Sequence, residues 1–133
     1  MKTLGLKNED GKVIHEVPII DPVPLFSHIV EHCTGFQNFF FRCLGDQPCS
    51  HQTPWGFVIY ADEIVSGNPL RHGNPRKCQA LYWSWSEFQQ DGLSREDLWF
   101  PLAVIRSSKV NDCGGLTVVW PQLLATQSES ARF

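Results

Sequence analysis

Two adjacent carboxylates end the segment of the chain that has the strongest strand signal. From Phe57 the chain runs through five apolar or β-branched residues without a charge and then reaches Asp62 and Glu63. A run of this kind, preceded by Pro54-Trp55-Gly56, is typical of a buried central strand. Burying a carboxylate costs free energy unless it is hydrated, paired or bound to a metal. The two acids are therefore the first candidates for chemistry.

Asp62 has two interpretations. It is a candidate metal ligand and catalytic residue, or it caps the loop after the strand and pairs with Arg71, Arg76 or Lys77. Adjacent strand residues point to opposite faces, so Asp62 and Glu63 do not form a paired-acid site by themselves.

A short basic segment follows this strand. It contains Arg71, His72, Asn74, Arg76 and Lys77, and two tryptophans, Trp83 and Trp85, come soon after it. Basic groups near aromatic rings can contact a nucleic-acid backbone and stack on bases. Arg71, Arg76 and Lys77 are therefore candidate nucleic-acid-binding residues. The alternative is an exposed loop, which the neighbouring glycines and prolines favour, with both tryptophans in the core.

The cysteines and histidines lack the spacing of a metal site. His28 and His32 share a helical face, and the residues that follow are Cys33, Cys43, Cys49 and His51. Structural zinc usually takes ligands in pairs two to four residues apart, and this set does not meet that rule. The alternative is that Cys33 and Cys43 are buried while the histidines face solvent. No Gly-x-Ser-x-Gly frame for a hydrolase is present either.

Composition bounds the class of protein. The 133 residues fit a single domain, which we assign to residues 1–125, followed by a polar, frayed tail at 126–133. A net charge of −3 without a long basic block argues against tight nonspecific binding to nucleic acid by this chain alone. No apolar run spans a membrane and the N-terminus lacks a secretory signal, so we expect an intracellular protein, cytoplasmic or nuclear. Five irregularly spaced cysteines suit reduced thiols.

The pattern predicts a β-hairpin at 1–20, a helical pair at 21–45 and a strand meander at 56–107. Asp10-Gly11 lies in the hairpin turn. Asp21 is the N-cap of the first helix, and the second covers 36–44. The strands cover 57–62, 78–86 and 99–106, and Ser94 is an N-cap between the last two.

Short connections favour antiparallel neighbours, so the predicted fold class is α/β (α+β) with a mainly antiparallel three-stranded sheet. The strands are joined by turn chemistry at 66–69 and 72–75. Residues 116–124 are ambiguous, because Pro121 costs about 3 kcal/mol in a helix interior and a strand at 116–120 is the alternative. The expected core contains an aromatic cluster: Trp55, Phe57, Tyr60, Trp83, Trp85, Trp99, Phe100 and Trp120.

Several short motifs of this chain resemble those of known sequences. They are Pro48-Cys49-Ser50, Pro54-Trp55, Asp62-Glu63, Gly67-Asn68-Pro69-Leu70, Arg76-Lys77, Trp83-Ser84 and Ala103-Val104-Ile105-Arg106-Ser107-Ser108. Together they extend over roughly residues 20–115 and resemble a large family of uncharacterised proteins multiplied in dinoflagellate genomes. More remotely, this segment resembles the first part of a transposase-derived RNase H-like core.

The remote resemblance implies a three-stranded antiparallel meander before a helix, with the first catalytic Asp at the position of Asp62. It also implies two divalent metals, Mg²⁺ or Mn²⁺, held by acids from separate elements. The chain departs from this pattern. Only 18 residues follow Gly115, their only carboxylate side chain is Glu129, and Pro121 interrupts the segment of the first core helix. The chain therefore looks like a partial core.

Three functions remain open from the sequence. The first is a non-catalytic, transposase-derived remnant without a cofactor, whose sheet edge or aromatic surface binds a protein partner or a second copy of the chain. The second is a metal-dependent nuclease or transposase-like enzyme that uses Asp62 with Mg²⁺ or Mn²⁺. The third is a nucleic-acid-binding module that uses the Arg71–Lys77 loop. No membrane partner is expected.

Overall fold

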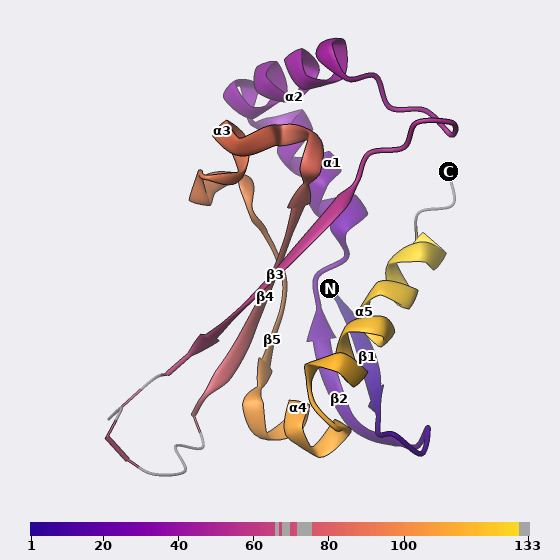
Figure 1. Cartoon of the computed structure of the whole chain (residues 1–133), viewed down its shortest axis with the longest axis vertical. Helices are drawn as coiled ribbons and strands as arrows, with labels where there is room; N and C mark the ends of the chain where they lie inside the picture. Colours follow the sequence, from indigo (N-terminus) through magenta and orange to yellow (C-terminus); the bar gives the residue numbers. More distant parts are fainter. Residues whose placement is uncertain (66, 68–69, 72–75, 131–133) are drawn as a thin grey trace.

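The described residues fold into a three-stranded sheet, a separate hairpin and five α-helices, which confirms the α+β class (Figure 1). This computed structural model describes residues 1–65, 67, 70–71 and 76–130. The elements in order are β1 (Lys2–Lys7), β2 (Val13–Ile19), α1 (Pro22–His32), α2 (Thr34–Asp46), β3 (Phe57–Ile64), β4 (Cys78–Trp85), α3 (Gln89–Leu93), β5 (Phe100–Arg106), α4 (Ser107–Cys113) and α5 (Leu116–Ser130). Two 3₁₀ turns, Ser86–Phe88 and Glu96–Leu98, flank α3.

The predicted meander is present, with strand order β3-β4-β5 and antiparallel pairing throughout. The β3–β4 register is regular from Phe57, opposite Trp85, to Ile64, opposite Cys78. The β4–β5 register shifts between Leu81 and Tyr82, which leaves Leu102 as an extra residue on β5. The turn segments predicted at 66–69 and 72–75 lie largely outside the described residues.

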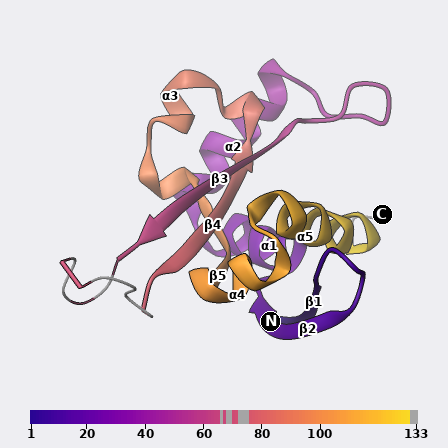
Figure 2. The ribbon, with the colours of Figure 1, turned by 60° about the horizontal axis from the view of Figure 1, so that its bottom comes forward.

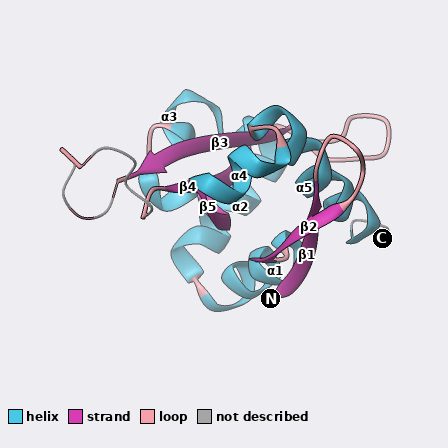
Figure 3. Ribbon diagram, turned by 90° about the horizontal axis from the view of Figure 1, so that it is seen from below, coloured by secondary structure: helices cyan, strands magenta, loops and turns pink. Residues whose placement is uncertain are grey.

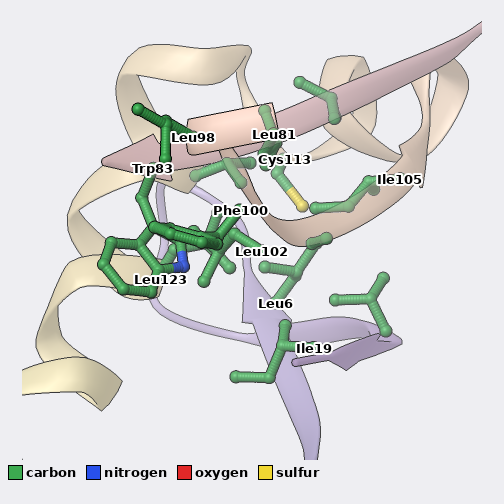
Figure 4. Packing of buried hydrophobic residues seen from close by; sticks show 14 of the residues in the cluster. Leu6, Ile19, Leu81, Trp83, Leu98, Phe100, Leu102, Ile105, Cys113 and Leu123 are labelled. Atoms are coloured by element: carbon green, nitrogen blue, oxygen red, sulfur yellow. The ribbon is translucent and has the colours of Figure 1, made fainter. Parts of the chain in front are cut away.

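The core lies on one face of this sheet, beneath α1 and α2. Trp83 of β4 and Phe100 of β5 are almost fully buried, with ring centroids 4.8 Å apart. Phe26 of α1 makes edge-on contacts with Phe36 of α2 and with Phe100. Leu6 of the hairpin and other apolar side chains enter the same cluster (Figure 4). Alternation along the strands thus places the bulky side chains of β4 where the sequence predicted them.

The hairpin joins the meander through a backbone bond and a helix. The Ile20 N–H donates to the Leu102 carbonyl (2.8 Å), so the end of β2 adjoins β5. On its other side β1 lies next to α5 (Figure 2). There the Gln122 side chain accepts from the Lys7 N–H (2.7 Å) and donates to the Lys7 carbonyl (2.8 Å). A side-chain amide therefore satisfies the strand edge as a neighbouring strand would.

The helical pair begins as predicted. The Asp21 carboxylate accepts from the Val23 N–H (3.3 Å), and Pro22 occupies the first turn. The second helix is longer than the predicted 36–44: α2 begins at Thr34 and continues through Gly45 to Asp46.

The structure decides the open conformation of residues 116–124 and corrects the expectation for Ser94. Residues 116–124 are helical throughout, with Pro121 inside α5, because Val119 and Leu123 on this helix are fully buried. The helix extends to Ser130, into the segment predicted as a frayed tail. Ser94 ends α3 instead of starting a helix, since its hydroxyl donates to the Asp91 carbonyl (3.0 Å). Within the described residues, none of the helices has the length and apolar character needed to cross a membrane.

Candidate binding site

Asp62 lies near the end of β3 on the face of the sheet opposite α1 and α2, called the uncovered face below, although the segment around α3 lies over its other end. Its backbone is opposite Ala80, its side chain is exposed, and it makes no hydrogen bond or ion pair with a described residue. Glu63 points to the other face, where it accepts from the Ser107 hydroxyl (3.3 Å) and lies 3.8 Å from the Lys77 ammonium. The two acids therefore diverge, as strand geometry requires.

No three His, Cys, Asp or Glu side chains come close enough to hold a metal in the parts of the chain that the structure describes. Asp62 as a metal ligand or catalytic residue thus stays a prediction. A site built on Asp62 would need carboxylates from elsewhere, because the two-metal mechanism holds its ions between several acids.

The residues of the basic segment have different surroundings in the structure. Lys77 pairs with Glu63 rather than with Asp62, on the face that carries the helices. Arg71 and Arg76 are exposed, and His72 and Asn74 lie outside the described residues. Nucleic-acid binding by Arg71, Arg76 and Lys77 stays a prediction as well.

Within the described residues, the histidines and cysteines considered for zinc do not form a group of three that could hold a metal. His28 and His32 stack on α1 with ring centroids 4.1 Å apart, and His32 Nδ1 bonds to the His28 carbonyl (2.9 Å). Cys33 is exposed, so its expected burial is wrong, since it lies at the junction of α1 and α2. Cys43 is partly buried, and this burial raises the pKa of its thiol. Cys113 is fully buried, and desolvation raises its thiol pKa too.

The outer edge of β3 is unpaired. The sheet ends at this strand, and among the described residues no further strand adjoins it (Figure 3). The Ser86 N–H donates to the Gly56 carbonyl (2.9 Å), which fixes the alternation: even-numbered residues of β3 bond to β4. The backbone N–H and C=O groups of the odd-numbered residues therefore point outward: Phe57, Ile59, Ala61 and Glu63.

From Phe57 to Ala61, this edge lacks the devices that usually block strand pairing. Natural edge strands carry proline, lysine, a bulge or an inward charge. β3 has a regular register over eight residues, and its first charged residue is Asp62. The edge is thus a template for another strand from Phe57 to Ala61.

An aromatic cleft of about 450 Å³ opens on the uncovered face beside this edge. Tyr60 of β3 and Tyr82 of β4 are cross-strand neighbours with ring centroids 6.4 Å apart. Trp99 stands at an angle of 56° to Tyr60, with centroids 5.9 Å apart. The Trp99 indole N–H donates to the Leu93 carbonyl (2.9 Å), which fixes this ring against the end of α3. Leu93, Ser94, Arg95 and Glu96 complete the lining.

The charged side chains of the cleft differ in their partners. The Arg95 guanidinium makes two bonds to Asp97, 3.1 Å from Nε and 2.7 Å from Nη2. This pairing lowers the pKa of the Asp97 carboxyl and raises that of Arg95. Glu96 is exposed, and its side chain has no hydrogen bond or ion pair with the described residues. Counted together with Asp97, which holds the guanidinium, the group of Arg95, Glu96 and Asp97 carries a formal charge of −1.

Sequence reasoning missed this cleft because it assigned two of its three rings, Tyr60 and Trp99, to the core. Tyr60 is 52% exposed and Trp99 is only partly buried, both on the uncovered face. The alternation of β3 contained the signal: Tyr60 follows Ile59, so it points away from the face that Phe57 and Ile59 share.

Comparison of the chain with protein-family models, curated proteins and solved structures finds no match. The resemblances to the dinoflagellate family and to a transposase-derived core therefore stay predictions. Pro121 no longer counts against such a core, because a helix that contains this proline does follow the meander.

Proposed function

We propose that the chain is a non-catalytic interaction module that binds an extended polypeptide segment by strand addition to β3. The observation that carries this proposal is the outer edge of β3, which is regular, apolar and unpaired by any described residue. Strand addition uses backbone hydrogen bonds for attachment and side-chain pockets for selection. The aromatic cleft beside the edge supplies such a pocket.

Simple energetics show why the edge and the cleft belong together. A backbone hydrogen bond contributes about 0.5–1.5 kcal/mol net, whereas ordering one residue of a flexible peptide costs about 1–2 kcal/mol. Backbone bonds alone therefore give little affinity. Binding requires apolar contact as well, which Tyr60 and Ile64 of β3 offer from the uncovered face, where each is at least 44% exposed.

The metal-dependent alternative has less support. It requires several carboxylates around Asp62, and the described residues bring no group of three together. Descent of the module from a transposase-derived core is compatible with the meander and the helices after it, and it remains part of the proposal.

Selection from a library of displayed random peptides tests strand addition, with Ala61→Pro as the decisive variant. The outward N–H of Ala61 is not used by β4, so proline removes a donor from the edge and leaves the β3–β4 ladder intact. Ala61→Ser is the matched control, because it keeps the N–H. We expect β-prone peptides to be enriched and to bind Ala61→Pro about tenfold more weakly, for one lost backbone bond.

Both variants must first show the thermal melting of the wild type. Equal peptide binding by Ala61→Pro and Ala61→Ser would refute strand addition. Light scattering from the same preparations measures the oligomeric state, and so tests whether the added strand comes from a second copy of the chain. A protein that stays monomeric at millimolar concentration and enriches no peptide would end the proposal.

A further inference from the structure

We infer that the aromatic cleft binds a cationic side chain, lysine or arginine, carried by the segment that adds to β3. This inference rests on the proposed function for the source of the side chain, but the chemistry of the cleft stands by itself. Three aromatic rings line it: Tyr60, Tyr82 and Trp99.

The rings are arranged as a corner. Tyr60 and Tyr82 lie nearly parallel, at 29° to one another, on neighbouring strands. Trp99 is inclined by 56° to Tyr60, so the two ring planes enclose an angle above the sheet. A cation within about 6 Å of a ring centroid is attracted to its face. A corner of this kind brings more than one face within that reach.

The charges around the cleft favour a cation over the other ligands that aromatic rings bind. The guanidinium of Arg95 is held by Asp97, whereas the carboxylate of Glu96 has no partner among the described residues. Asp62 lies two residues beyond Tyr60 on the same face. Arg106 lies on this face too, but opposite Cys78 at the far end of the sheet. Lys77 pairs with Glu63 on the other face.

A nucleotide base could stack on the same rings, but its phosphate would lie near the carboxylates of Glu96 and Asp97, which outnumber the Arg95 guanidinium. The charge pattern thus disfavours a nucleic acid and favours a cation.

The position of the cleft suits a side chain from an added strand. A strand paired with β3 lies about 4.8 Å from it, and alternate side chains of that strand project over the uncovered face. Tyr60 lies between such a strand and the rest of the cleft, so the side chain must be long. Lysine and arginine cross an aromatic ring with an apolar stem and place the charge at the tip.

Small probes test the cleft without requiring a strand. The probes are Nα-acetyl-lysine amide and Nα-acetyl-arginine amide, with the uncharged Nα-acetyl-norleucine amide as the matched control and uridine monophosphate as the nucleotide. NMR titration of the full chain follows the ring signals of Tyr60, Tyr82 and Trp99. We expect the two cations to shift these signals and the norleucine and nucleotide probes to have little effect.

Two variants at exposed positions test the contacts. Tyr60→Leu should weaken binding of the cations about two- to fivefold, the effect of one ring at an exposed site. Glu96→Gln should weaken it by up to about fivefold, and by less in high salt. Glu16→Gln on β2 is the matched charge control and should have no effect.

Several outcomes would overturn the inference. They are equal binding of the norleucine and lysine probes, stronger shifts with uridine monophosphate, or cation binding that Tyr60→Leu and Glu96→Gln leave unchanged. The two proposals fail separately. Ala61→Pro should leave binding of the small cations unchanged while it weakens binding of peptides.

Discussion

The bond between Gln122 and the hairpin can be tested by changing a single atom type. Gln122→Glu keeps the size of the side chain and an oxygen that can accept from the Lys7 N–H, but it replaces the Nε2 donor by a second carboxylate oxygen. That nitrogen donates to the Lys7 carbonyl at 2.8 Å and to the Val118 carbonyl at 3.1 Å. The substitution therefore leaves a carboxylate facing a carbonyl oxygen.

The magnitude follows from the bonds lost. One hydrogen bond between strand and helix contributes about 0.5–1.5 kcal/mol, and solvent near the exposed Lys7 can replace part of it. Repulsion between carboxylate and carbonyl adds to the loss, so the free energy of unfolding should fall by about 1–2 kcal/mol at pH 7. For a chain of this size, each kcal/mol lowers the melting temperature by roughly 3–5 °C.

Urea unfolding and hydrogen exchange measure the two parts of this effect. The amide of Lys7 should exchange faster in Gln122→Glu, while amides of β4 change only with global stability. Protonating the introduced carboxyl at low pH restores a donor, so the difference from wild type should shrink there. Gln90→Glu, on the exposed surface of α3, controls for the added charge. Equal unfolding free energies for the two variants would show that the amide bonds do not hold α5 to the hairpin.

Three further predictions concern the sheet and its uncovered face. Ser84→Ala should lower the free energy of unfolding by about 1–3 kcal/mol in urea, because the buried hydroxyl donates to the Leu98 carbonyl at 2.7 Å. The pKa of Asp97 is lowered in the folded state. The Asp97 carboxylate therefore stabilises the fold above its unfolded pKa of about 3.9, and this stabilisation is lost as the pH falls through its folded pKa. In Arg95→Ala, NMR titration should show that the pKa of Asp97 rises. Mn²⁺ should shift the melting temperatures of wild type and Asp62→Ala equally, and a shift confined to the wild type would favour the metal-dependent alternative.

The sequence predicted the elements whose signals are local. The meander follows from apolar alternation, and its strands begin and end within a few residues of the predicted bounds. The start of α1 follows from Asp21 and Pro22 for the same reason, since an N-cap acts within one turn. The sequence also predicted that Asp62 and Glu63 point to opposite faces, because successive side chains of a strand alternate between its two faces.

The features that the sequence did not predict depend on contacts between distant segments. Pro121 is tolerated in α5 because Val119 and Leu123 are buried and Gln122 binds β1, a strand more than a hundred residues away. The cleft depends on Trp99 being held by the Leu93 carbonyl on the uncovered face. Neither arrangement leaves a pattern in a short window, because tertiary contacts override local preference.

The contact of Lys7 with Gln122 joins residues 115 positions apart and has a consequence for the order of folding. Closing so long a loop carries a large entropic cost, and contacts of high sequence separation slow folding. The hairpin is synthesised well before α5, the helix that covers its edge. During translation at about 5–20 residues per second, the edge of β1 therefore stays open for about 6–23 s, the time needed to add the 115 residues up to Gln122. Nascent chains should be most prone to aggregation or chaperone capture in that interval.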